Sequence, residues 1–195
     1  KPEYVIVASP ASHHVEIAKR LLNHSIPVLI EKPLAHNGPA CLPITYICNQ
    51  SPLKKVAVGY CLRFLPSAKA VKSFLDSSML GEIYNVKANV GQYLPEWRSD
   101  KEFKNSVSVS KILGGGALLE LSHELDCLHW FMGDLYLQHS WLSTTEELGL
   151  EVEDIADLVL LSEKNVYITV HLDFVQKSPQ RRCEFIGQNG RLEWD

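Results

Sequence analysis

Three short apolar runs in the first sixty residues most constrain what this chain can fold into. They are YVIVA (4–8), VLI (28–30) and KVAVGY (55–60), and helical apolar spacing fills the segments between them. Strands that are apolar on both faces and alternate with short helices are typical of βαβ units in a parallel sheet that is covered on both sides. The chain is therefore expected to begin with an α/β unit.

The pattern changes after Tyr60. A helix is expected over 66–79 and an alternating strand over 83–93, followed by a polar loop (94–112) and, after three glycines, a second long helix to Met132. Period-two alternation then predicts strands near 135–144, 154–162, 165–175 and 182–187, the last turning through Asn189-Gly190. This part favours an open, mostly antiparallel sheet with helices on one face, so the whole chain is α/β followed by α+β.

Charge and cysteine usage exclude several classes of protein. The net charge is −4 with no basic block, which argues against a nucleic-acid partner and against binding to an anionic membrane. No apolar run approaches the ~18 residues of a membrane span. The five cysteines are scattered, with no CxxC pair, so neither a disulfide framework nor a zinc cluster is expected. Reduced cysteines point to the cytoplasm.

The stretch VLIEKPLA ends a buried strand in two opposite charges, Glu31 and Lys32. Ligands of open α/β sheets bind beyond the carboxyl ends of the strands, and the turn at Ser9 and Pro10 is expected to lie beside this end. Pro33 fixes the backbone that follows the lysine. The pair is either a surface ion pair or a lysine placed for chemistry.

A second candidate site lies in LGGGALLELSHELDCLHWFMGD (113–134). On one continuous helix, an apolar stripe would face away from His123, Asp126 and Trp130, with Glu120 and Cys127 beside them. The predicted stripe consists of Leu118, Leu121, Leu125, Leu128 and Met132. His123 and Asp126 would be neighbours, as a general base and its carboxylate or as a solvated pair.

The chain contains no complete metal-binding or nucleotide-binding motif. The HELDC segment lacks the second histidine of the zinc pattern HExxH, so we expect no metal, although a zinc hydrolase using His123 and Glu124 is an alternative that metal analysis would reveal. The chain has no GxSxG, Walker loop or GxGxxG.

Two groups of aromatic and cationic residues are further candidates. Tyr93, Trp97 and Arg98, in the loop GQYLPEWRSD, offer a stacking surface and a cation that suit a sugar ring or an anionic group, or they anchor a surface loop. The residues just after the third apolar run line a cleft or pack at a hinge: Tyr60, Arg63 and Phe64.

Taken together, these segments resemble the glucose-fructose oxidoreductase/inositol dehydrogenase (Gfo/Idh/MocA) family. The resemblance covers nearly the whole chain and rests on six stretches: VIVASPASHHVEIAKRLL, VLIEKPLA, VGYCLRFLPSAKAV, GEIYNVKA, GGGALLELSHELDCLHWFMGD and RCEFIGQNGRLEWD. It implies residues 1–61 as the C-terminal part of a Rossmann domain that binds NAD or NADP. Residues 62–195 would form the substrate and oligomerisation domain, which commonly associates through its sheet, here as a homodimer or homotetramer.

The resemblance also implies roles for single residues. Lys32 matches the catalytic lysine, and His123 matches the histidine that exchanges a proton with the substrate while hydride moves. Asp126 matches a substrate-binding carboxylate. The nicotinamide side would be lined by Ser9, Pro10, His14 and Glu31. Family members often have an aspartate four residues before the histidine, whereas Glu120 lies three before His123, which leaves its role at the substrate open.

The implied activity is hydride transfer between nicotinamide and a hydroxyl or keto carbon of a sugar-like small molecule. The QYLPEWR and SHELD segments resemble members linked to surface polysaccharides. Because the glycine fingerprint and the usual tail are not in this sequence, we expect it to be part of a longer protein and inactive alone. A non-catalytic sugar- or dinucleotide-binding regulator on the same scaffold is the alternative.

Overall fold

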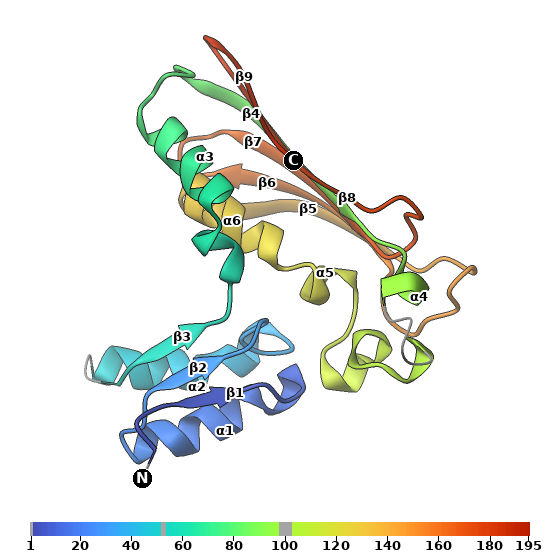
Figure 1. The fold of residues 1–195 in the computed structure, drawn as a ribbon. Coiled ribbons are helices and arrows are strands. Elements are labelled where there is room, and N and C mark those ends of the chain that lie inside the picture. Colours follow the sequence, from blue (N-terminus) through green and yellow to red (C-terminus); the bar gives the residue numbers. More distant parts are fainter. Residues whose placement is uncertain (1, 52–53, 98–102) are drawn as a thin grey trace.

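The computed structural model describes residues 2–51, 54–97 and 103–195. Two sheets follow one another along the chain, a small one near the N-terminus and a larger one that holds the C-terminus (Figure 1). A single connection, which runs from the last strand of the small sheet into η1 (Cys61–Phe64), joins them. The described helices include none with the length and apolarity needed to cross a membrane.

The small sheet is parallel, as the first three apolar runs predict. Its strands β1 (Val5–Val7), β2 (Val28–Ile30) and β3 (Val56–Val58) lie in chain order. Helices α1 (Ala11–Asn23) and α2 (Gly38–Gln50) connect them and pack against each other.

Only one face of this sheet carries helices within the described residues, so the expectation of two covered faces is wrong for this part of the chain. Both crossovers run between neighbouring parallel strands in the same direction, and right-handed crossovers of that kind place their helices on the same side. On that side Val7, Val28 and Ile30 are buried, whereas Ile6 on the other face is 53% exposed.

The large sheet is open and mostly antiparallel, which confirms the predicted fold class. It consists of β4 (Ile83–Gly91), β5 (Leu135–Ser143), β6 (Ile155–Ser162), β7 (Tyr167–Asp173), β8 (Gln180–Gly187) and β9 (Gly190–Trp194). The strand order is β5-β6-β7-β4-β8-β9, and only the central β4–β7 pair is parallel. The last two strands form a hairpin as predicted, but its turn is Gln188-Asn189, one residue earlier than expected, because Gly190 already pairs with Gly187.

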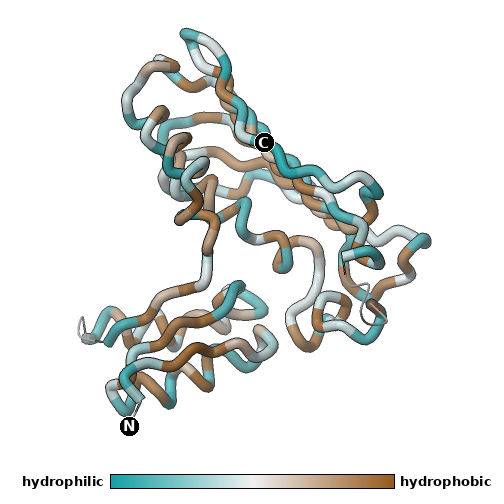
Figure 2. Tube along the Cα trace, viewed as in Figure 1, coloured by the Kyte–Doolittle hydropathy of each residue, from teal (hydrophilic) through white to brown (hydrophobic). Residues whose placement is uncertain are grey.

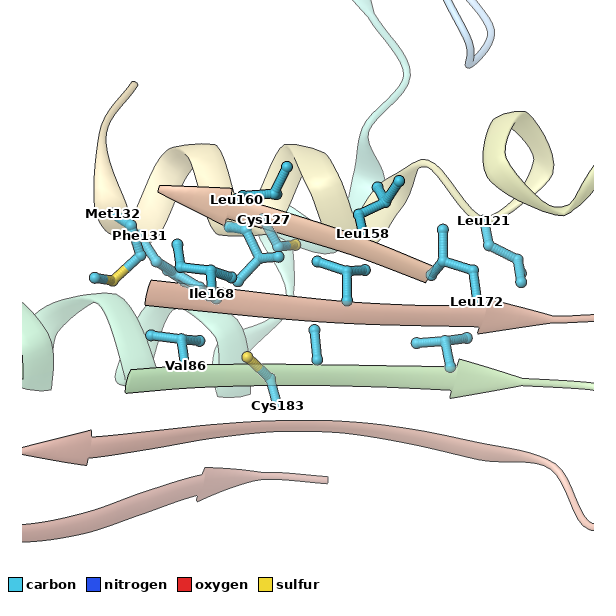
Figure 3. Packing of buried hydrophobic residues seen from close by; sticks show 14 of the residues in the cluster. Val86, Leu121, Cys127, Phe131, Met132, Leu158, Leu160, Ile168, Leu172 and Cys183 are labelled. Carbon is cyan, nitrogen blue, oxygen red and sulfur yellow. The ribbon is translucent and has the colours of Figure 1, made fainter. Parts of the chain in front are cut away.

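One face of the large sheet makes the main core. Helices α3 (Pro66–Asp76) and α6 (His123–Met132) lie across it, and side chains from β4, β6 and β7 point toward α6 (Figure 3). Period-two alternation places Val86, Ile168 and Leu172 in this layer. Figure 2 shows the hydrophobic segments concentrated along the strands. The opposite face is open and exposes Trp141 and Tyr167.

The second long helix of the sequence prediction is in fact two helices. The four-residue α5 (Ala117–Glu120) stops at Leu121, and α6 begins at His123. Of the predicted stripe, Leu121, Leu128 and Met132 are buried, whereas Leu118 and Leu125 are only partly buried; Cys127 and Phe131 are buried as well. The buried surface of α6 is therefore wider than the predicted stripe, which it includes in part.

The loop expected over 94–112 contains short helical turns where it is described. They are α4 (Leu94–Trp97), η2 (Phe103–Asn105), η3 (Val107–Val109) and η4 (Lys111–Leu113). Gly114, with φ of +89°, lies so close to the small sheet's helical layer that a Cβ there would be 3.0 Å from the Cβ of Ala11. This segment therefore reaches back from the large sheet to the start of α1.

The core assignment can be tested at Phe185, which has no exposed surface and packs edge-on against Phe131. Phe185→Ala removes a large side chain that the rigid sheet cannot replace, and we expect it to lower the free energy of unfolding by about 3–5 kcal/mol in urea denaturation. Ile112→Ala, at a side chain that is 84% exposed, is the control and should cost less than about 0.5 kcal/mol. Equal losses would contradict this core.

Candidate active site

Lys32 connects the small sheet to the segment before α6. It lies two residues after β2, and its Nζ donates to the backbone oxygen of Glu120 at 2.8 Å and to Glu120 Oε2 at 3.1 Å. Both side chains are largely buried. A lysine that was predicted at a strand end is thus held by a residue 88 positions away in the sequence.

The break between α5 and α6 creates the carbonyl that Lys32 binds. In an unbroken helix the N–H of Glu124 would donate to the oxygen of Glu120. Here it turns to Leu121 at 3.4 Å, and the Glu120 oxygen accepts from Lys32 instead. The interruption that the periodicity of the sequence did not reveal is therefore part of the site.

Ser108, in the segment before the three glycines that approaches the start of α1, also contacts Glu120. Its hydroxyl donates to Glu120 Oε1 at 3.0 Å, and the residue has no exposed surface. Gly115 allows the approach, because a Cβ there would lie 2.5 Å from the backbone oxygen of Ser108. Nothing in the sequence singles out Ser108, since a lone serine in a loop has no periodic signal.

His123 begins α6 beside Lys32. Its ring meets the edge of Tyr60 with centroids 5.6 Å apart, and its Nδ1 is buried with no hydrogen-bond partner among the described residues. Burial lowers the pKa of this imidazole, and the positive charges of Lys32 and Arg181 lower it further, against Asp126 and Glu31. The surroundings of His123 therefore disfavour the charged form of its imidazole.

Asp126 is bound by an arginine from the connection between the sheets. Arg63 donates through Nε to Oδ2 at 2.6 Å and through Nη2 to Oδ1 at 2.7 Å. The guanidinium also lies 5.7 Å from the ring centroid of Trp130. The sequence left two interpretations of Arg63, hinge packing and cleft lining. This geometry supports hinge packing, because Arg63 links α6 to η1.

A second ion pair joins α6 to β8. Arg181 Nε donates to Glu124 Oε1 at 2.7 Å, and Glu124 is only 6% exposed. Burial raises the pKa of Glu124, against the charge of Arg181. From the sequence, Glu124 is a candidate only in the zinc-hydrolase alternative, and Arg181 is not singled out. Period-two alternation in β8, which turns Arg181 and Arg182 to opposite faces, was the available signal.

The other predicted residues of the small sheet lie at its carboxyl edge. Ser9 and Pro10 follow β1, and Glu31 follows β2 with its N–H bonded to Val7 at 2.9 Å. His14 is buried, and its two ring nitrogens lie 2.7 Å from the oxygen of Ser9 and 2.9 Å from that of Pro33. His14 therefore ties the two loops of this edge together through their backbones.

The same edge has the features that a polar ligand needs. The hydroxyl of Ser12, in the first turn of α1, is buried without a hydrogen-bond partner among the described residues, and so is Nδ1 of His36. Gly59 follows β3, and a Cβ there would approach Glu31 Oε2 to 3.2 Å. Unsatisfied donors at a helix N-terminus beside a close backbone approach suit one end of a phosphorylated or amide-bearing cofactor.

The aromatic candidates after β4 have contacts of their own. Tyr93 donates from its hydroxyl to Glu147 Oε1 at 3.3 Å, and Lys177 Nζ lies 5.4 Å from its ring centroid. Trp97 lies against Phe174, with centroids 6.3 Å apart. Arg98 falls outside the described residues. Within the described ranges, no three His, Cys, Asp or Glu side chains gather as metal ligands would.

The lowered pKa of His123 predicts a titration that NMR can follow. The imidazole should protonate below its ordinary value of 6.5, and Lys32→Met should raise its pKa because a neighbouring positive charge is lost. Since the folded state disfavours the charged ring, the fold should lose stability as the pH falls through this range. Lys72→Met, remote from the ring, should leave the curve unchanged. A titration above 6.5 in the unsubstituted protein contradicts this environment.

The Arg63–Asp126 fork predicts a stability difference. Asp126→Asn keeps the shape but removes the charge from two short hydrogen bonds, so the free energy of unfolding should fall by about 1.5–3 kcal/mol. Asp134→Asn at the exposed end of α6 is the matched control and should cost less than about 0.5 kcal/mol. Urea denaturation compares the two. A loss no larger than that of the control would show that Arg63 does not anchor α6.

Comparison with known proteins gives this geometry a context. Residues 68–193 match the GFO/IDH/MocA C-terminal domain, and residues 1–60 match the NAD-binding Rossmann fold of an oxidoreductase family. Inositol 2-dehydrogenase 2 of Saccharopolyspora erythraea is 30% identical, over 96% of this chain and 53% of its own length. Oxidoreductase P35 of Formosa agariphila is 23% identical, over 97% and 58%.

Solved structures share the fold. The WlbA dehydrogenase of Bordetella pertussis, in complex with NADH and UDP-GlcNAcA, superposes with a TM-score of 0.86 at 20% identity, over 99% of this chain and 55% of that one. The chain thus spans about half the length of the relatives it matches. With a C-terminal domain match that covers most of its residues, this chain belongs to the GFO/IDH/MocA family of oxidoreductases.

Proposed function

We propose that the natural protein containing this chain is an NAD(P)-dependent oxidoreductase that moves hydride between nicotinamide and a hydroxyl or keto carbon of a sugar or sugar derivative. The observation that carries the proposal is the position of Lys32. It is fixed at the carboxyl edge of the parallel sheet by Glu120, close enough to His123 for its charge to lower the pKa of that imidazole. A fixed ammonium can polarise a substrate oxygen, and an imidazole whose charged form is disfavoured can accept its proton, so the two together suit alcohol oxidation.

The matched relatives support the chemical class. One relative is named an inositol 2-dehydrogenase, and one solved neighbour is in complex with NADH and UDP-GlcNAcA. Another, GenD2 from gentamicin A biosynthesis, holds NAD. We propose the same cofactor class and a sugar-like substrate here, and surface polysaccharide biosynthesis as the finer assignment.

The edge formed by Ser9, Pro10 and Glu31 would hold the nicotinamide side of the cofactor, with His14 shaping it through the backbone. The unsatisfied hydroxyl of Ser12 fits such a polar ligand. When bound, the cofactor supplies the acceptor or donor of hydride.

The chain's own residues would handle the substrate oxygen and its proton. A lysine ammonium has three N–H donors, and two of those of Lys32 point to Glu120. The third can donate to the reacting oxygen and stabilise negative charge on it. His123 would take the hydroxyl proton at Nε2 in the oxidative direction and return it in the reductive direction, because Nδ1 is buried.

The remaining predicted residues are proposed to hold the sugar. Asp126 keeps lone pairs beyond the two that Arg63 occupies, since a carboxylate accepts about four hydrogen bonds. Tyr93, Trp97 and Arg98 would stack on or bind the ring from the loop after β4. Glu120 would act on the substrate mainly by holding Lys32.

We also propose the domain division at residues 61 and 62 and association of two or four copies through the large sheet. The separate sheets and separate cores support the division. The exposed Trp141 and Tyr167 on the open face support the association, because large aromatic side chains are enriched at interfaces.

Substitution of Lys32 tests the proposed function in the natural protein. Lys32→Met removes one donor to the reacting oxygen, and we expect turnover to fall roughly 100- to 1,000-fold while the affinity for NAD or NADP changes little. Rates come from nicotinamide absorbance and affinities from calorimetry. Lys72→Met is the control, because that lysine pairs with Asp76 on the surface of α3. Unchanged turnover in Lys32→Met would instead favour a non-catalytic binding protein.

A further inference from the structure

The side chain of Arg181 lies on the face of the large sheet that α6 covers, which is also the face of the candidate site. In the register it lies opposite Val90, which is buried beneath the helices, whereas Arg182 lies opposite Asn89. Arg182 accordingly lines a hollow on the open face, together with Asn89 and His171. Two consecutive arginines therefore serve opposite faces, and only Arg181 reaches α6.

Glu124 fixes the orientation of the Arg181 guanidinium. The 2.7 Å bond to Oε1 uses Nε, and Glu124 is almost fully buried. A guanidinium is planar and carries five N–H donors, so one charge-assisted bond at Nε fixes the direction of its other edge. Among the described residues, neither Nη of Arg181 has a hydrogen bond, and the side chain remains 43% exposed.

The charges around the site favour a negatively charged ligand at the Nη edge of the Arg181 guanidinium. Lys32 and Arg181 both lower the pKa of His123, and these two charges rank ahead of the opposing effects of Asp126 and Glu31. The ten-residue helix α6 also begins at His123, which adds the positive end of its dipole. Lys32 already donates to the backbone oxygen and the carboxylate of Glu120, and Arg63 already donates to both carboxylate oxygens of Asp126.

We propose that the two Nη groups of Arg181 bind a carboxylate on the substrate, which makes the substrate a sugar acid instead of a neutral sugar. The inference rests on the proposed function and names its substrate class. A carboxylate matches the planar fork with two parallel bonds. A singly charged group suits the site better than a doubly charged phosphate, because Lys32, Arg63 and Arg181 each already face one carboxylate.

The test compares matched sugars in the natural protein with NAD⁺ present. Calorimetry gives the affinities for D-glucuronate and D-glucose, and for D-galacturonate and D-galactose. At least one acid should bind about tenfold or more tightly than its neutral partner, which corresponds to roughly 1.4 kcal/mol. Equal affinities within both pairs, or no binding of either acid, would overturn the inference.

Variants separate recognition from folding. Arg181→Gln should abolish the preference for the acid, and Arg181→Lys, which keeps the charge but loses the fork, should retain only part of it. Arg182→Gln, on the opposite face of the same strand, should retain it fully. If Arg181 only braces Glu124, acid and neutral affinities will fall together with the melting temperature, and the ratio will stay unchanged, which refutes the carboxylate site.

The inference and the proposed function fail in different ways. Acids that bind through Arg181 but never reduce NAD⁺ or NADP⁺ would keep the carboxylate site and reject the oxidoreductase. Oxidation of neutral sugars with no preference for the acids would keep the oxidoreductase and reject the carboxylate site.

Discussion

The bond between Lys32 and Glu120 is the interaction on which the site depends. The small sheet places the lysine after β2, but only the large-sheet half of the chain provides something for it to bind. The bond in turn requires that α5 end before α6 begins, so that one backbone oxygen is released from helical pairing. Backbone geometry in one half thus sets the position of a charge in the other.

The three ion pairs of the site share one arrangement. Lys32 with Glu120, Arg63 with Asp126 and Arg181 with Glu124 all bring a cation from another element to the segment 120–126. Buried carboxylates without such partners would carry a large desolvation cost. The three pairs therefore let this short segment hold charges near His123, while burial and the nearby cations lower the pKa of the imidazole.

Much of the fold could be predicted from the sequence, because apolar runs and period-two alternation record burial directly. The parallel start, the open antiparallel sheet and the existence of the final hairpin followed from these signals, although its turn lies one residue earlier than predicted. The helix break and the Ser108 contact did not, since both depend on atoms that meet only after folding. Arg63 and Arg181 were underestimated for the same reason: an arginine in a sequence does not reveal which carboxylate it will face.

The close approach at Gly115 has a consequence for how such proteins diverge. The glycine touches no group that acts on a substrate, yet it lets the Ser108 backbone come near enough for its hydroxyl to reach Glu120. A lineage that acquired a side chain there would push that segment outward and lose the alignment of the lysine, with every reactive group still in place. Under the proposed function, such a descendant would lose activity without any change in the residues proposed to meet the substrate.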